Sequence, residues 1–407
     1  MSLMRRRGLM MGLAVAGCSP MTDGAAAAAR AGAGLGAFHG ALAQLEAGRR
    51  QHLAVLQIGD SHTANDGFSG RMRELFQARF GAGGRGLLPP AIPFRYYRPS
   101  QVTVTADGWR LFGAYDGAPG PFGLALVRQR ADGAASMVVR ADEPGVLDLV
   151  AVDALGQPRG GTIDVAFDTG QRAVVPTDTR REQPLWVEAP VAAGASMVTL
   201  TTRGDGPVEL FGVRCLSSRK GVTWSNLGTI GATVGITARW DHAVVASEMK
   251  ALDPKLVVLA FGTNEGFKDS TDPAEYRALY RELLRALRAM APGASVAIAL
   301  PPDGVRRLSG TSVAACPSRP GDRQGFAPPP QLTMVRETQR RIAASEGLLA
   351  WDWSAAMGGD CSIMPMSRTD PPQAAPDLVH LFRPGYRKVA EPLFDALMQG
   401  YRGGGRA

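Results

Sequence analysis

Apolar residues in the first ninety positions form two different patterns, a continuous run and a helical spacing. A short apolar run at 53–58, closed by a glycine, predicts a buried strand because it is too short for a helix. Large apolar residues over 68–80 then recur every three or four positions, which is the spacing of one helix face. The turn between these two elements contains Ser61. A further helix is expected before the strand, at about 36–50.

The same alternation of strands and helices returns after position 220. Buried strands are expected at 256–261, 296–300 and 348–351, and helices at about 272–291, 331–346 and 386–397. Strands that alternate with helices form a parallel sheet with both faces covered. We therefore predict an α/β fold, a three-layer α/β/α flavodoxin-like domain built from residues 36–92 and 220–400.

Residues 93–219 have a different texture. Short runs rich in β-branched residues are separated by Gly, Asp and Pro, and no helical stripe appears. Several short strands at regular spacing with turn signals predict a β-sandwich. Because the strand–helix alternation resumes after this segment, we expect the sandwich to be a module inserted into the α/β domain. A chain of 407 residues is long enough for two such units.

Residues 1–18 have the form of an export signal. Three arginines at 5–7 precede an apolar run that ends in small residues before Cys18. The run is too short to span a membrane as a mature helix, and it resembles bacterial lipoprotein signals, in which the Cys is acylated. We expect export to the periplasm with a lipid anchor on Cys18, and plain secretion is the alternative. The Ala/Gly-rich residues 19–35 predict a flexible tether, and 401–407 are expected to be a disordered tail.

Charge and cysteine usage narrow the class of partner. The net charge of +8 comes from scattered arginines with no long basic block after the N-terminus, so no nucleic-acid partner is expected. The charge favours an anionic surface such as a cell-wall polymer or lipid headgroups, or simply follows from an Arg-rich composition. Cys316 and Cys361 lie in Gly/Pro-rich loops and are the favoured disulfide pair, whereas Cys215 lies in a strand-like run. Without a Cys-x-x-Cys motif or a His cluster, no metal site is expected.

Ligands of a parallel sheet bind at the carboxyl ends of its strands, and Ser61 follows directly on the first predicted strand. A serine needs a base to become a nucleophile, and the base needs an orienting carboxylate. Of five histidines, His380 is the best base, because Asp377 on the same loop can reach its far ring nitrogen. Structural positions are expected for His39 and His52, and a surface or packing position for His242. His62 adjoins Ser61, but neighbouring side chains in a tight turn point apart.

Acyl transfer at a serine also needs hydrogen-bond donors for the developing oxyanion. The Ser61 backbone N–H is expected at a helix N-terminus, where donors are free, and Gly231 permits close backbone approach. Asn264 can offer a side-chain amide at a strand end. Taken singly, Gly231 reads as a turn glycine and Asn264 as a helix cap. Together with Ser61 and His380 they predict an oxyanion hole.

Four sequence blocks occur in a characteristic order. They are Gly-Asp-Ser at 59–61, Gly231, Gly-x-Asn at 262–264 and Asp-x-x-His at 377–380. This order resembles the SGNH (GDSL-like) hydrolases. The resemblance implies a serine esterase that needs no cofactor, and it assigns the nucleophile, the two members of its activating pair and the oxyanion donors to the residues given above.

Finer detail is similar to the peptidoglycan O-acetyl esterase branch of that family. The residues that carry it are Gly-Asp-Ser-His-Thr at 59–63, Gly-Thr-Asn-Glu at 262–265, Pro-Pro-Asp at 301–303 and Trp-Asp-Trp at 351–353, with an inserted carbohydrate-binding-module-like β domain. The resemblance implies removal of O-acetyl groups from peptidoglycan through an acetyl-serine. An O-acetyltransferase acting on peptidoglycan, or on an exopolysaccharide such as cellulose, stays open, because a sugar hydroxyl can replace water in the second step. A non-catalytic polysaccharide-binding lipoprotein is the alternative from another class.

Overall fold

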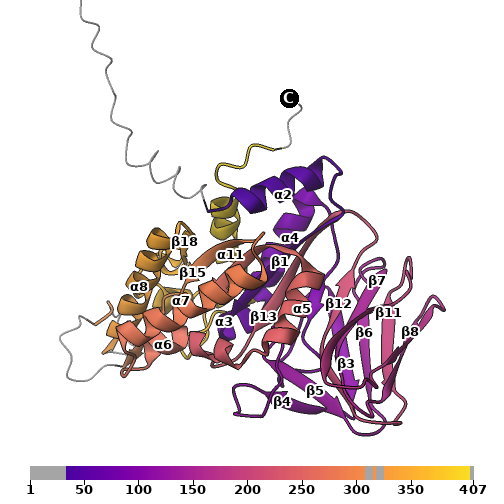
Figure 1. The fold of residues 1–407 in the computed structure, drawn as a ribbon. Coiled ribbons are helices and arrows are strands. Elements are labelled where there is room, and N and C mark those ends of the chain that lie inside the picture. Colours follow the sequence, from indigo (N-terminus) through magenta and orange to yellow (C-terminus); the bar gives the residue numbers. More distant parts are fainter. Residues whose placement is uncertain (1–33, 308–314, 318–324, 404–407) are drawn as a thin grey trace, which may run out of the picture.

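A five-stranded parallel sheet lies at the centre of the α/β unit (Figure 1). The structure, a computed structural model, describes residues 34–307, 315–317 and 325–403. The strands are β1 (His52–Gly59), β13 (Gly221–Gly228), β14 (Pro254–Ala260), β15 (Ser295–Leu300) and β18 (Leu349–Asp352), in the spatial order β13-β1-β14-β15-β18. Numbered along the chain, this is the 2-1-3-4-5 order of flavodoxin-like folds.

Strand β14 shows why the sheet needs a helical layer on each face. Its residues Leu256 and Val258 join one hydrophobic core, and the intervening Val257 and Leu259 join another. The first core also takes in residues of α2 (Gly36–Glu46), α4 (Asp66–Phe80) and α11 (Arg383–Met398). The second takes in residues of α5 (His242–Leu252), α7 (Pro273–Met290) and α8 (Pro330–Glu346). The predicted three-layer α/β/α arrangement is therefore confirmed.

Strand β13 is a member of this sheet that the hydrophobic pattern does not predict. Thr223, Ser225 and Asn226 interrupt its apolar run, although all three are buried. Ser225 Oγ accepts a hydrogen bond from the Leu87 N–H at 2.9 Å, and the Asn226 amide donates to the Thr63 carbonyl at 2.6 Å. Polar side chains that are satisfied by distant segments hide a buried strand from any analysis of local pattern.

Residues 86–216 contribute two antiparallel sheets, one ordered β10-β7-β12-β5-β4 with β2 paired to β12, the other β3-β6-β11-β8-β9. The bounds are β2 (Gly86–Leu88), β3 (Val102–Asp107), β4 (Arg110–Gly113), β5 (Val127–Ala131), β6 (Ser136–Ala141), β7 (Leu149–Gly156), β8 (Thr162–Phe167), β9 (Arg172–Pro176), β10 (Gln183–Glu188), β11 (Met197–Thr202) and β12 (Val208–Leu216). Apolar residues from both sheets fill one core, as in a sandwich. The predicted inserted β-sandwich is therefore confirmed as part of the fold.

The sandwich begins earlier than the predicted boundary at residue 93. Strand β2 precedes that position, and its residues Gly86–Leu88 pair antiparallel with Val213–Cys215 of β12. Three residues are too few for hydrophobic periodicity to reveal a strand. Short elements complete the described part of the chain: α3 (Ser61–Ala64), η1 (Val234–Arg239), α6 (Thr263–Phe267), β16 (Arg306–Arg307), β17 (Phe326–Ala327), α9 (Trp353–Met357) and α10 (Ile363–Met366).

Both ends of the described chain make tertiary contacts. Leu35, in the predicted tether, is fully buried in the core beside α2. Tyr401, in the predicted disordered tail, contacts the Phe80 ring and donates a hydrogen bond to Glu46 at 2.6 Å, so the tail prediction is wrong for this residue. The export signal, Cys18 and most of the tether lie outside the described residues.

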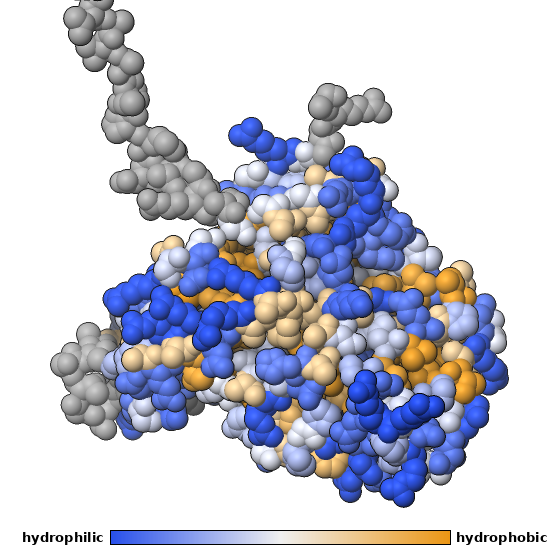
Figure 2. All heavy atoms as spheres, viewed as in Figure 1, coloured by the Kyte–Doolittle hydropathy of each residue, from blue (hydrophilic) through white to orange (hydrophobic). Residues whose placement is uncertain are grey.

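The described surface carries no long hydrophobic helix. Among residues 34–307, 315–317 and 325–403, none of the helices combines the length and apolar character needed to cross a bilayer. On the face drawn in Figure 2, hydrophobic side chains form separate patches among hydrophilic ones.

Candidate active site

Ser61 lies at the carboxyl end of β1, in the first turn of α3. Asp60 caps this turn, since its carboxylate accepts the His62 N–H at 3.0 Å. Burial raises the pKa of Asp60 to about 6, against the lowering effect of its hydrogen bond from the His62 N–H. Gly59 is required by close packing, because a Cβ there would stand 2.3 Å from the Ala260 carbonyl oxygen. The turn after β1 is thus braced by short-range contacts and presents the serine at the sheet edge.

The His380 imidazole lies between Ser61 and Asp377. Its Nε2 is 2.9 Å from Ser61 Oγ, across 319 positions of sequence, and its Nδ1 is 2.7 Å from Asp377 Oδ2. With Nδ1–H donating to the carboxylate, Nε2 is free to accept the serine proton. The structure therefore brings together the serine, histidine and aspartate expected from sequence.

Asp377 holds the backbone of this loop as well as the ring. Its Oδ1 accepts the N–H groups of Val379 at 2.9 Å and His380 at 3.0 Å. Burial opposes ionisation of Asp377, but these bonds and the bond to the imidazole outweigh it and lower its pKa. A carboxylate that stays ionised can stabilise the imidazolium that forms when His380 takes a proton.

Gly231 occupies the third position of a tight turn over residues 229–232. The Ala232 N–H donates to the Thr229 carbonyl at 3.2 Å, and Gly231 has a φ of 72°, which a residue with a side chain rarely adopts. The Thr229 N–H donates to the Gly59 carbonyl at 2.9 Å, which ties the turn to the end of β1. Gly231 is thus held close to the serine turn.

Asn264 and Glu265 of α6 bind the backbone at the end of this turn and just after it. The Asn264 amide nitrogen donates to the Ala232 carbonyl at 2.8 Å, and Glu265 Oε1 accepts the Val234 N–H at 2.6 Å. Burial raises the pKa of Glu265 to about 7, while the Val234 N–H lowers it. Asn264 therefore lies beside the Gly231 turn, and its amide carries a second N–H that can serve an oxyanion.

His62 lies beneath the catalytic imidazole. Its ring stacks on His380 with the centroids 5.1 Å apart, its Nδ1 is 3.0 Å from Tyr386 Oη, and Trp353 meets it edge-on. Burial lowers the pKa of His62 to about 3, and repulsion from His380 adds to this effect, so the ring is neutral. Sequence reasoning misses the stacking of His62 on His380, because spacing along the chain does not reveal it.

Asp66 forms a buried ionic cluster that sequence reasoning also misses. Its carboxylate accepts hydrogen bonds from Arg73 at 3.0 Å, from Arg85 at 3.1 Å and from the Ser100 N–H at 2.7 Å. Burial opposes ionisation of Asp66, but the two guanidinium groups hold its pKa well below its usual range. The cluster joins α4 to the loop that follows β2, so it fixes part of the inserted unit beside Ser61.

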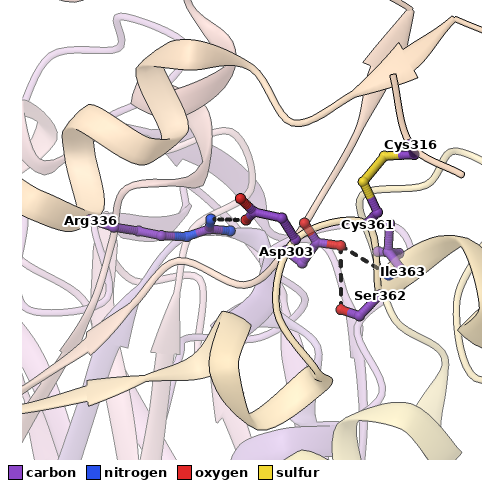
Figure 3. The surroundings of a disulfide bond; sticks show 7 residues. Asp303, Cys316, Arg336, Cys361, Ser362 and Ile363 are labelled. Atoms are coloured by element: carbon purple, nitrogen blue, oxygen red, sulfur yellow. Dashed lines mark hydrogen bonds and ion pairs between the residues drawn. A yellow bond between two sulfur atoms is a disulfide. The ribbon is translucent and has the colours of Figure 1, made fainter. Parts of the chain in front are cut away.

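A disulfide and a buried carboxylate brace the segment before the His380 loop (Figure 3). Cys316 and Cys361, the pair expected from sequence, are bonded in the structure, and Cys215 is buried and free. Asp303 Oδ2 accepts the Ile363 N–H at 2.9 Å, beside the disulfide. Burial raises the pKa of Asp303, with the Ile363 N–H acting against it.

The remaining predicted residues lie elsewhere. His39 Nε2 is 2.8 Å from the Leu397 carbonyl, His52 Nε2 is 2.8 Å from the Ser217 carbonyl, and His242 begins α5. In the parts of the chain that the structure describes, no three His, Cys, Asp or Glu residues are grouped so that they could hold a metal ion.

Serine hydrolases activate their nucleophile through hydrogen bonds that link a hydroxyl, an imidazole and a carboxylate. The same triad lies here at the carboxyl edge of a flavodoxin-like sheet. The fold and the site thus define the class. Residues 193–388 match the model of the GDSL-like lipase/acylhydrolase family. The solved structure of a peptidoglycan O-acetylesterase is similar, with a TM-score of 0.73 and 27% identity, covering 89% of this chain and 95% of that chain. Both matches support an SGNH (GDSL-like) hydrolase with esterase chemistry.

Other solved structures share less. An acetyl xylan esterase has a TM-score of 0.29 and 15% identity, covering 43% of this chain and 80% of that chain. A family two carbohydrate esterase from Clostridium thermocellum has a TM-score of 0.31 and 12% identity, covering 77% of this chain and 98% of that chain. No curated protein matches the sequence. The family match begins inside the sandwich, so it includes Gly231, Asn264 and His380 but not Ser61.

Proposed function

We propose that this protein removes O-acetyl groups from a cell-envelope polysaccharide, with peptidoglycan as the favoured substrate. The contact of 2.9 Å between Ser61 Oγ and His380 Nε2 is the observation that carries the proposal. Similarity to a peptidoglycan O-acetylesterase over 89% of this chain supports the choice of acetyl group and polymer.

In the first half of the reaction, Ser61 Oγ attacks the acetyl carbonyl carbon while His380 Nε2 takes the hydroxyl proton. The carbonyl oxygen becomes an oxyanion, which the N–H groups of Ser61 and Gly231 and the Asn264 amide stabilise. The tetrahedral intermediate then breaks its bond to the sugar oxygen. That oxygen leaves with the proton from His380, and an acetyl-serine remains.

In the second half, His380 takes a proton from water as the water oxygen attacks the acetyl-serine. The bond to Ser61 Oγ breaks, the serine regains its proton from His380, and acetate leaves. If a sugar hydroxyl attacks in place of water, the same groups transfer the acetyl group to that sugar. Acetate release and acetyl transfer are therefore two outcomes of one experiment.

The test is acetate release from purified O-acetylated peptidoglycan. For Ser61→Ala we expect kcat to fall by about 10⁴-fold or more, with the fold retained by circular dichroism. Ser345→Ala, on α8, is the matched control and should keep wild-type turnover. Turnover that survives in Ser61→Ala excludes this nucleophile. Acetylated sugar oligomers formed in place of free acetate would make the protein a transferase.

We also propose that the protein is exported and anchored to the periplasmic side of a membrane through an acylated Cys18. The charged and apolar segment before this cysteine supports the proposal. Mass spectrometry of the mature protein should find an N-terminal, lipid-modified Cys18. A mature N-terminus elsewhere, or an unmodified cysteine, rejects the anchor.

A further inference from the structure

Exposed hydrophobic side chains gather at one place on the described surface. Seven large hydrophobic residues are exposed on the whole described surface, and four of them line two adjoining cavities, one of which contains Ser61. These four are Tyr96, Leu111, Tyr115 and Ile230, with Tyr96 72% and Tyr115 61% exposed. Single exposed apolar residues need no explanation, but a contiguous group at a catalytic site indicates a binding surface.

The two cavities adjoin each other. The first, of about 320 Å³, is lined by Ser61 and His380, with Tyr96 and Arg98 on its wall. The second, of about 290 Å³, contains none of the proposed catalytic side chains, and Phe94 and Ile230 line both. A ligand longer than the acetylated group can therefore extend from the first cavity into the second.

The second cavity is built mostly by the inserted unit. Leu111 lies in β4, and Tyr115 and Asp116 follow that strand. The Tyr115 ring lies against the catalytic turn, because a Cβ placed on Gly231 would be 2.9 Å from it. An aromatic face, aliphatic neighbours and one carboxylate match a sugar ring, whose C–H face stacks on aromatic groups while its hydroxyls donate to carboxylates.

The loop that carries Phe94, which lines both cavities, is held in place before any ligand binds. Phe94 and Tyr96 lie on the loop after β2, and the Asp66 cluster grips the end of this loop at Ser100. The Arg85 guanidinium also donates to the Ser100 carbonyl at 3.0 Å. A wall anchored by buried ion pairs loses little conformational freedom on binding.

We propose that the second cavity is a subsite for the sugar ring next to the acetylated residue of a glycan chain, with Tyr115 as its stacking platform and Asp116 as a hydroxyl acceptor. The proposal rests on the proposed function, since the first cavity must hold the acetylated sugar. The inserted sandwich then selects polymeric over monomeric substrate, and the α/β unit supplies the chemistry.

The experiment compares two substrates of the same chemistry, a single O-acetylated amino sugar and an O-acetylated oligosaccharide from peptidoglycan. The variants are Tyr115→Ala, Tyr115→Phe and Leu111→Ala, with Val191→Ala as an exposed control that lines neither cavity. Wild-type kcat/KM should be higher on the oligosaccharide. Tyr115→Ala should lower kcat/KM on the oligosaccharide by about tenfold and on the monosaccharide by about threefold or less, while Tyr115→Phe keeps the platform and the preference.

A binding measurement separates failure of the subsite from failure of the proposed function. Calorimetric titration of the acetylated oligosaccharide into Ser61→Ala, with and without Tyr115→Ala, reports the subsite without turnover. Weaker binding in the double variant supports the subsite even if wild-type protein releases no acetate, in which case the proposed function alone fails. Equal binding, equal losses on both substrates, or a Tyr115→Ala protein that matches the Val191→Ala control would overturn the proposal.

Discussion

His380 is the residue at which the contacts of the site converge. It bonds Ser61 on one ring nitrogen and Asp377 on the other, and His62 stacks on its face. The burial of His62 keeps that ring neutral, so no second positive charge opposes the imidazolium that forms during the reaction. Each neighbour of His380 therefore has a different role. Ser61 is the proton donor, Asp377 orients the ring, and His62 packs against its face.

The orienting role of Asp377 leads to a prediction at this scale. Asp377→Asn keeps an oxygen for the N–H groups of Val379 and His380, so the loop should keep its shape. Its amide would donate to Nδ1, which places the ring proton on Nε2, where it blocks proton transfer from the serine. We expect kcat on an aryl acetate to fall by about 10³–10⁴-fold. Asp395→Asn, exposed on α11, is the control, and a kcat of Asp377→Asn within threefold of wild type would remove the carboxylate from catalysis.

Individual site residues could be predicted from sequence where few residues fit the required chemical role. Ser61 follows a strand in a turn, and only one of five histidines has a carboxylate three positions away in a loop. Asp66 offered no such signal, because Asp and Arg residues are ordinary on helix surfaces and its partners include Arg85 and Ser100, outside its helix. Its burial depends on where the inserted unit lies.

At the scale of elements, the segment before the His380 loop is stabilised from several directions. The disulfide ties Cys316 to Cys361, Asp303 binds the N–H that begins α10, and the Val305 N–H donates to the Leu378 carbonyl at 3.0 Å. The His380 loop is therefore supported by residues that do not line the cavity of Ser61 and His380.

The disulfide closes a separation of 45 residues, and its loss should be measurable. We expect the Cys316→Ser/Cys361→Ser variant to lose about 2–4 kcal/mol of unfolding free energy in urea titrations, because the unfolded chain gains freedom. A reductant should destabilise the wild type by a similar amount and leave the variant unchanged. Identical urea midpoints for reduced and oxidised wild type would show that the bond adds no stability.

At the scale of the whole molecule, the sandwich and the α/β unit meet over a pair of buried carboxyl groups. Asp153 of β7 and Glu248 of α5 are both buried, and they lie close enough for their negative charges to repel each other. Burial raises the pKa of each, and repulsion from Glu248 raises that of Asp153 further. Glu248 Oε2 also accepts the Leu124 N–H at 2.7 Å. A proton bound by either carboxyl group in the folded chain would relieve the repulsion between them.

This pair predicts a dependence of stability on pH. Carboxyls whose pKa is raised by folding bind more protons in the folded chain, so unfolding free energy falls as pH rises from about 4 through the folded pKa values. Glu248→Gln removes one ionisation and keeps an oxygen for Leu124. We expect its thermal midpoint to drop less than that of the wild type between pH 5 and pH 8. Parallel declines in the two proteins would contradict a raised pKa for this pair in the folded state.

The sequence by itself determined the elements and the chemistry at their ends. Short apolar runs revealed β1 and β14, and a spacing of three to four residues revealed helices that cover them, since those patterns depend on neighbours along the chain. Four polar blocks at strand ends indicated a serine hydrolase for the same reason. Strand β13 escaped because its polar residues are satisfied by partners from other segments.

The tertiary structure alone decided what distant segments build together. Ser61 and His380 meet across 319 positions, the Asp66 cluster spans two structural units, and a cavity forms where Tyr115 of the insert lies against Gly231. Such contacts depend on how completed elements pack. No local period records that packing, because each segment would show the same pattern with a different neighbour.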